Sequence, residues 1–304
     1  MKKLCFILAV LAAVCVNAQV QDIPLCGEWH FIADSADHST GLPTEAAVVS
    51  VPHTYNIMDG LEDYAGRAWY ERRLDIPMEL KGRQLRLQFE AVYHDATVYI
   101  NGRKAGSHVG KGYTPFSVDI TPYVHFGQEN KLVVEVDNSF STNNFPYKRA
   151  FDWANDGGIY RPVSLHVSGR RSIRYAHFTP SLNLADSTGT CHVSIRLYER
   201  QRVGDGTSGM PKVKRALFTI KVNKKQTGEV VFDKQLVLKQ TPQGTFETDI
   251  GCGKVEPWHF DHPSLYSFEE RHYHPLPLAT GRGYAGIPRF FRYSTTTPAS
   301  LHGL

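Results

Sequence analysis

The feature that most constrains the fold of this 304-residue chain is a series of short segments in which apolar and polar side chains alternate. Residues 85–90 and 132–137 show this period of two, which is the pattern of a strand with one buried face. Residues 96–100 are β-branched and aromatic, and Asn101-Gly102 follows them as a strong hairpin signal. Residues 66–167 contain no amphipathic helix of ordinary length, so this part of the chain is predicted to be all-β.

Many short strands joined by Gly, Pro and Asn turns favour a β-sandwich over residues 20–168. A second set of alternating segments begins near Gly169, and residues 202–211 between them are expected to form an exposed loop. About 100 residues of short strands are typical of an immunoglobulin-like sandwich, predicted here for residues 169–268. The strands predicted for it are 173–184, 191–198, 216–222, 229–238 and 245–250.

Four motifs in these segments resemble the N-terminal region of glycoside hydrolase family 2, the group that includes β-galactosidases and β-glucuronidases. The resemblance implies a jelly-roll sandwich of the galactose-binding type at residues 20–168, followed by the immunoglobulin-like sandwich. The motifs are G-x-W-x-F at 27–31, V-P-H-T-Y-N at 51–56, G-G-I-Y-R at 157–161 and the P-W-H-F-D-H-P-S-L-Y segment at 257–266.

In the family, two glutamates on a (β/α)8 barrel cleave the glycosidic bond, and the acid/base glutamate follows an Asn. This sequence has no Asn-Glu dipeptide, and too few residues follow Tyr266 for a barrel. We therefore expect the N-terminal portion of an exported enzyme acting on O-glycosyl bonds. It would supply sugar-binding and scaffold domains that pack on a barrel in a full-length relative. No catalytic residue, metal or cofactor is assigned, and by itself the chain is expected to be inactive.

Two other functions stay open, a stand-alone carbohydrate-binding module and a non-catalytic interaction protein built from β-sandwiches. The best support for the binding module is the aromatic segment 140–153 of the loop 138–156, a loop that mixes aromatic rings with amides and carboxylates. Rings can stack on the apolar face of a pyranose while the polar groups bind its hydroxyls. The resemblance implies that this loop and the V-P-H-T-Y-N segment line a substrate pocket for a β-glycoside or a plant or host glycan. The alternative is that these groups cap turns, and the choice between Asp152 and Asp156 is open. The substrate-binding candidates are Thr54, Tyr55, Asn56, Asp152, Trp153 and Asp156.

Residues 1–18 read as a secretory signal peptide, with Lys2 and Lys3 before a short apolar run and a small-residue cleavage site before Gln19. A lipoprotein anchored through Cys15 is an alternative. The mature chain is expected in the periplasm or outside the cell, since no other apolar run is long enough to span a membrane. The net charge of +4 comes without a basic stripe, which argues against nucleic acid as a partner. Asp34, Asp37 and His38 are interpreted as a solvated turn rather than a metal site.

The segment 269–304 differs in composition, since no Asp, Glu or Lys occurs from Arg271 onward. A change of reading frame would explain such a tail, and a genuine divergent tail is the alternative. The second sandwich is then expected to end near residue 268 with an exposed sheet edge.

Overall fold

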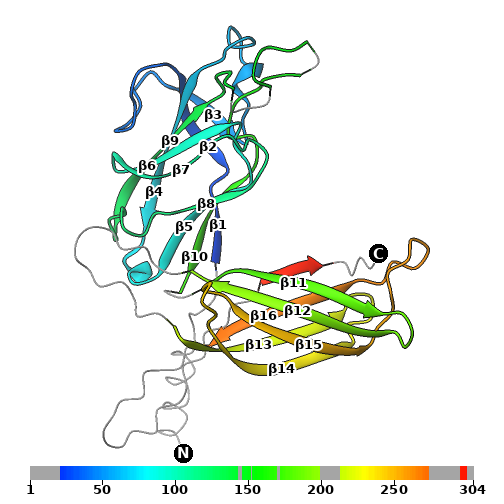
Figure 1. The fold of residues 1–304 in the computed structure, drawn as a ribbon. Coiled ribbons are helices and arrows are strands. Elements are labelled where there is room, and N and C mark those ends of the chain that lie inside the picture. Colours follow the sequence, from blue (N-terminus) through cyan, green and yellow to red (C-terminus); the bar gives the residue numbers. More distant parts are fainter. Residues whose placement is uncertain are drawn as a thin grey trace, which may run out of the picture. The chain divides into compact units, whose positions relative to one another are not determined.

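The computed structural model describes residues 21–142, 146–151, 153–169, 172–198, 213–273 and 295–299. The predicted signal segment and the predicted loop 202–211 lie outside these residues. The chain divides into two compact units, one comprising Gln21–Val167 and the other beginning at Ser168 (Figure 1). Both are built from β-sheets, and the described residues add only the single turns η1 (Tyr55–Ile57) and η2 (Met78–Leu80). The all-β prediction is therefore confirmed.

The first unit consists of two sheets, one of six strands and one of four. The six-stranded sheet has the order β3 (Ala47–Val51), β2 (Gly27–Ala33), β4 (Arg67–Ile76), β9 (Gln128–Asp137), β6 (Asp95–Ile100) and β7 (Arg103–His108). The four-stranded sheet has the order β1 (Gln21–Pro24), β10 (Val163–Ser168), β5 (Gln84–Phe89) and β8 (Phe116–Asp119). The pairs β1–β10, β2–β3, β2–β4, β4–β9, β5–β8, β6–β7 and β6–β9 are antiparallel, as expected for strands joined by short turns.

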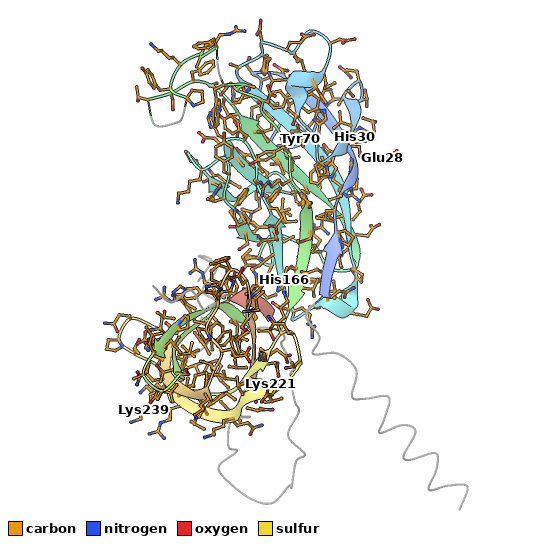
Figure 2. The ribbon with its side chains drawn as sticks, turned by 90° about the vertical axis from the view of Figure 1, so that its right-hand side faces the viewer. Glu28, His30, Tyr70, His166, Lys221 and Lys239 are labelled. Atoms are coloured by element: carbon orange, nitrogen blue, oxygen red, sulfur yellow. The ribbon has the colours of Figure 1, made fainter. Side chains whose placement is uncertain are left out.

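The inner faces of these two sheets form one hydrophobic core. On β5 every second side chain, Leu85, Leu87 and Phe89, is fully buried, as the alternation predicted. On β2 the buried Trp29 lies between Glu28 and His30, which point outward (Figure 2). Burying one such apolar side chain contributes about 1.5–3 kcal/mol, so the register of these strands is strongly specified.

The predicted hairpin joins β6 to β7. Asn101 and Gly102 both have positive φ, 51° and 76°, which is the geometry of a type I′ turn. The Asn101 side chain secures the turn by donating to Asn130 Oδ1 at 2.8 Å and accepting from the Lys131 amide at 2.9 Å. The hairpin prediction is confirmed.

The second unit also contains two sheets around a core of its own. Its core includes the stacked rings of Phe178 and Phe268, 4.3 Å apart, and the buried Cys191. Strands lie within a few residues of each of the five predicted segments. One sheet has the order β11 (Ile173–Asn183), β12 (Thr188–Leu197) and β15 (Phe246–Lys254), and the other β14 (Val230–Lys239), β13 (Arg215–Lys224), β16 (Tyr266–Tyr273) and β17 (Thr295–Ala299).

The last two strands use residues that the sequence analysis assigned to the tail. β16 begins at Tyr266 and continues past residue 268 to Tyr273, while β17 pairs along it with Ala299 opposite Tyr266. Tyr266, Phe268 and Glu270 are all buried, so the alternation of the strand continues past the expected boundary at residue 268. One edge of β16 is paired with β17, and the exposed sheet edge expected for the second sandwich, which was assigned to no particular strand, stays a prediction.

Candidate sugar-binding site

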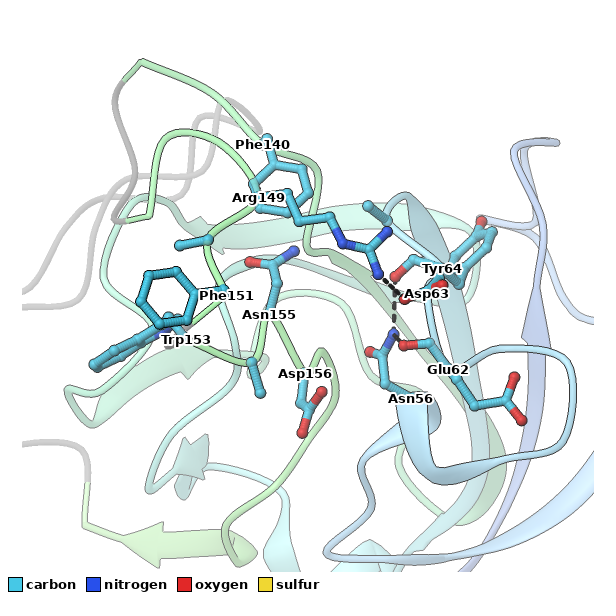
Figure 3. A pocket seen from close by; sticks show the side chains of 13 residues that line it. Asn56, Glu62, Asp63, Tyr64, Phe140, Arg149, Phe151, Trp153, Asn155 and Asp156 are labelled. Carbon is cyan, nitrogen blue, oxygen red and sulfur yellow. Dashed lines mark hydrogen bonds and ion pairs between the residues drawn. The ribbon is translucent and has the colours of Figure 1, made fainter.

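A pocket of about 300 Å³ lies in the first unit, between the loop after β9 and the segment that follows η1. Its volume is at the lower end of the range for small-molecule sites. Phe151 and Trp153 lie on one side of the pocket, and Asn56 and Tyr64 lie on the other (Figure 3). The complete lining is Asn56, Glu62, Asp63, Tyr64, Ala65, Phe140, Arg149, Ala150, Phe151, Trp153, Ala154, Asn155 and Asp156.

Asn56 organises one wall of the pocket from a buried position. Its amide nitrogen donates to the carbonyl oxygens of Leu61 and Tyr64, both at 2.9 Å. Its amide oxygen accepts from the backbone N–H of Gly157 at 2.8 Å. One side chain thus closes the turn 56–64 and ties it to the end of the loop 138–156. A buried amide whose nitrogen and oxygen both form hydrogen bonds to the backbone holds the bonded segments in a single arrangement.

Asn138, at the end of β9, connects the same two segments and is fully buried. Its amide nitrogen donates to the carbonyl of Tyr64 at 3.1 Å and to that of Asn155 at 2.7 Å. Its amide oxygen accepts from the Gly66 N–H at 2.8 Å. Asn155 in turn donates to the carbonyl of Asn138 at 2.6 Å. Asn56, Asn138 and Asn155 form a network, here called the asparagine network, that holds together the two segments on either side of the pocket.

The glycine pair of the G-G-I-Y-R motif has a packing role beside this network. The Gly157 carbonyl accepts from the Tyr55 N–H at 3.0 Å, and the Ile159 carbonyl accepts from the His53 N–H at 2.8 Å. A Cβ on Gly157 would collide with the Tyr55 hydroxyl group. Gly158 has φ +146°, and a Cβ there would collide with the His53 carbonyl oxygen. Only glycine allows the two motifs to approach this closely.

Two phenols around the pocket are protonated at neutral pH, and burial moves their pKa values further above it. Burial raises the pKa of Tyr93 to about 12, and that of Tyr64 is also raised by burial. Tyr93 donates to Asn155 Oδ1 at 3.1 Å, and Tyr64 donates to the Arg67 carbonyl at 2.6 Å. These hydroxyl groups act as neutral donors that fix the walls of the pocket.

Charged groups border the pocket. Arg149 forms an ion pair with Asp63, which links the loop 138–156 to the turn 56–64 (Figure 3). Glu62 and Asp156 are exposed carboxylates in the lining. Carboxylates and amides beside aromatic rings can accept from the hydroxyl groups of a ligand while the rings contact its apolar face.

The structure brings three of the six predicted site residues into the pocket, namely Asn56, Trp153 and Asp156. Tyr55 lies in the core with its ring stacked on Phe31, so it faces away from solvent. Thr54 precedes η1 and does not line the pocket. Asp152 lies outside the described residues, so the choice between Asp152 and Asp156 remains a prediction. The role of each of the six in substrate binding also stays a prediction.

The sequence analysis did not name Asn138, Tyr64 or Arg149 among the individual site candidates, although Asn138 and Arg149 belong to the loop 138–156 that it placed at the pocket. Asn138 carries a usable signal, because an Asn directly after a strand begins an irregular loop. Its partners are the carbonyls of Tyr64 and Asn155, the Gly66 N–H and the side-chain oxygen of Asn56, and no spacing rule links these to it. The turn at Asp34 and His38 is held by a hydrogen bond between their side chains at 2.9 Å. Within the described ranges, no three His, Cys, Asp or Glu side chains are grouped to hold a metal ion.

The chain is similar in sequence to known proteins. Residues 33–168 match the family described as "Glycosyl hydrolases family 2, sugar binding domain". The chain is 30% identical over 227 residues to a β-galactosidase of Thermoanaerobacter pseudethanolicus, covering 72% of this chain and 28% of that protein. It is 32% identical over 211 residues to a β-glucuronidase of Bacteroides fragilis, covering 67% of this chain and 29% of that protein.

Solved structures show the same fold. A β-glucuronidase of Bacteroides uniformis matches with a TM-score of 0.70 and 21% identity over 93% of this chain and 32% of its own. A β-glucuronidase of an uncultured Clostridium species matches with a TM-score of 0.68 and 22% identity, over 94% of this chain and 45% of its own. The chain therefore spans less than half the length of these proteins. Among the described residues, no helix has the length and apolar character needed to cross a membrane.

Proposed function

Because residues 33–168 are a sugar-binding domain of glycosyl hydrolases family 2, we propose that this chain supplies the N-terminal sugar-binding and scaffold units of an exported family 2 glycosidase. The observation that carries the proposal is the pocket, which sets the rings of Phe151 and Trp153 opposite buried Asn56. The relatives named above are β-galactosidases and β-glucuronidases, so the substrate class is a β-glycoside.

The pocket binds and orients a sugar rather than cleaving it. Hydrolysis with retention needs two carboxyl groups about 5–5.5 Å apart, which the family resemblance places on a (β/α)8 barrel. The described residues form sandwiches and contain no such barrel. In the complete enzyme the two units would pack on the barrel, and the loop 138–156 would contribute one wall of the substrate site.

A pyranose in the pocket would meet two kinds of surface. Trp153 is 41% exposed, so its ring can cover the apolar face of the sugar. Asp156 and Glu62 would accept hydrogen bonds from hydroxyl groups, and the asparagine network keeps their backbone in place. Such a pre-formed site lowers the entropy cost of binding.

Binding is tested with the purified chain and two probes, methyl β-D-galactopyranoside and methyl β-D-glucuronide. We expect saturable changes in the amide NMR signals of the loop 138–156 with at least one probe, and the loss of these changes in Trp153→Ala. Absence of saturable binding by both probes would refute the proposed sugar-binding function. Aryl β-glycosides test the non-catalytic role, and robust turnover by this chain would overturn it.

Export is the part of the proposal that rests on residues 1–18, with their basic start, apolar run and small-residue cleavage site. Expression in a Gram-negative host should give periplasmic protein whose N-terminus is Gln19. Recovery of the uncleaved chain in the cytoplasm would contradict export.

A stand-alone carbohydrate-binding module is the second candidate function. It is favoured by the exposure of Phe151 and Tyr147 on the loop, since exposed aromatic side chains often mark binding surfaces. The two functions differ in how strongly the isolated chain binds. A self-sufficient module would capture a glycan on an array, whereas a pocket wall that needs a barrel would bind the small probes only weakly.

A further inference from the structure

A second pair of aromatic side chains lies beside the pocket. Tyr113, in the loop after β7, is 52% exposed, and its ring centroid lies 6.3 Å from that of Trp153 at an interplanar angle of 90°. Tyr113 and Trp153 are here called the aromatic shelf. Tyr113 does not line the pocket, whereas Trp153 does. Trp153 is therefore shared between the pocket and the shelf.

The aromatic shelf is held in place by ring packing and hydrogen bonds. The Tyr113 ring packs on that of Tyr93 at 5.6 Å, and Tyr93 is nearly buried. The Tyr93 hydroxyl donates to Asn155 Oδ1, so the support of the shelf is joined to the asparagine network. The Tyr160 hydroxyl donates to the Gly112 carbonyl at 2.7 Å and fixes the residue before Tyr113.

Gly112 makes this packing possible. A Cβ at that position would come within 3.2 Å of both the Tyr93 ring and the His94 side chain, closer than ordinary van der Waals contact. Because Gly112 has no side chain, the backbone passes close to the Tyr93 ring, next to the half-exposed Tyr113. An exposed ring that is held in place in this way loses little conformational entropy when a ligand covers it.

From this juxtaposition we propose that the aromatic shelf is a second sugar subsite, so that the ligand is a β-glycoside of at least two pyranose units. The inference rests on the proposed function, because one unit occupies the pocket and the next unit lies over Tyr113. The shelf offers rings and no buried charge, which suits the apolar face of a neutral pyranose. The shared Trp153 keeps the two units adjacent.

The test measures the affinity of the full chain for two matched pairs of probes. The monosaccharide probes are the two methyl glycosides named above. Their two-ring counterparts are lactose and the disaccharide glucuronyl-β-1,3-N-acetylglucosamine. Tyr113→Ala should weaken disaccharide binding by about threefold to tenfold, as expected for loss of one aromatic contact. It should leave the affinity for the methyl glycoside within about twofold.

Two controls keep this result interpretable. Tyr175→Ala removes a similarly exposed Tyr, 43% exposed, from β11 of the second unit and should change neither affinity. Tyr113→Phe keeps the ring and should retain disaccharide binding. Amide NMR spectra of each variant establish that the first unit is folded.

Unchanged disaccharide affinity in Tyr113→Ala would overturn the second subsite while the sugar pocket stands. An equal loss for both probe sizes would also overturn it, because Tyr113 would then support the pocket itself. If the parent chain binds none of the four probes, the proposed sugar-binding function fails, and the second subsite fails with it.

Discussion

Asn138 and Asn155 exchange reciprocal side-chain to backbone hydrogen bonds: each amide nitrogen donates to the carbonyl oxygen of the other residue, at 2.7 and 2.6 Å. The two residues bracket the loop that carries Phe151 and Trp153. Closing a long loop at its base restricts its conformations without any contact along its length. The position of the pocket wall therefore depends on the amide of Asn138, which does not line the pocket, and on that of Asn155, which does.

Replacing Asn138 should reduce stability and sugar binding together. Asn138→Ala leaves the carbonyl groups of Tyr64 and Asn155 and the Gly66 N–H without this partner. The free energy of unfolding should fall by about 1–3 kcal/mol, the cost of leaving buried polar groups unsatisfied. Urea unfolding followed by the fluorescence of buried Trp29 and Trp69 measures it. Asn183→Ala, at an exposed strand end, is the control, and equal stability of the two variants would contradict the assigned role.

Gly157→Ala should destabilise the first unit because the added methyl group collides with Tyr55. Overpacking of this kind costs about 1–3 kcal/mol. The matched control is Gly251→Ala on β15, where an added Cβ has nothing within 4 Å. That variant should stay within about 0.5 kcal/mol of the parent chain. Thermal unfolding of both variants separates the two cases, and a harmless Gly157→Ala would refute the packing argument.

The first unit should lose stability on acidification through His53. This ring is half-buried and lies 2.9 Å from the Tyr70 hydroxyl, measured from Nδ1. Burial lowers the pKa of His53 in the folded chain below its usual value of about 6.5. Below pH 6.5 the unfolded chain therefore binds a proton that the folded chain does not, so this part of the stability is lost as pH falls through the folded pKa.

Urea unfolding at pH 7.5 and pH 5.5 checks this expectation in the parent chain and in His53→Gln, which keeps a polar group near Tyr70. The decrease in unfolding free energy between the two pH values should be smaller in the variant. His108 and His166 also have pKa values lowered by burial, so some decrease should remain. Identical pH dependence of the two proteins would exclude His53 as a contributor.

Trp153 should report sugar binding directly. Of the Trp residues in the first unit that the structure describes, Trp29 and Trp69 are buried and Trp153 is 41% exposed. A saturating probe should shift the emission of the parent chain to shorter wavelength, and Trp153→Phe should abolish this shift. Trp258→Phe, in the second unit, should leave it unchanged. A shift that survives in Trp153→Phe and disappears in Trp258→Phe would place the ligand in the second unit.

Much of the fold could be predicted from the sequence because strand burial is a local pattern. The period of two in 85–90 and 132–137, and the turn at Asn101-Gly102, depend only on neighbouring residues. The sequence was a weaker guide to where the last sheet ends, because strand pairing there depends on residues far apart in the chain. The composition of the tail suggested that the sheet ends at residue 268, but the pairing of β16 with β17 involves residues more than twenty positions apart along the chain.

Part of the site could also be predicted, because the composition of a loop is a local property of the sequence. The loop 138–156 stands out by its aromatic and polar composition, and its Trp153 lines the pocket. Tyr55 belongs to the same motif as Asn56, yet one side chain enters the core and the other closes the wall of the pocket. Their order in the sequence does not show which is which, because the orientation depends on contacts with Gly157 and Phe31.

By itself, then, the sequence determined the strands, their turns, the family of the sugar-binding domain and the loop that carries the aromatic rings. Only the tertiary structure decided which polar groups meet. Asn56 lies on a different segment from Asn138 and Asn155, which are at the two ends of one loop, and Tyr113 reaches Trp153 from a third segment. The physical reason is that alternation and turn preference act between near neighbours, whereas a pocket is formed by side chains that folding brings together from distant positions.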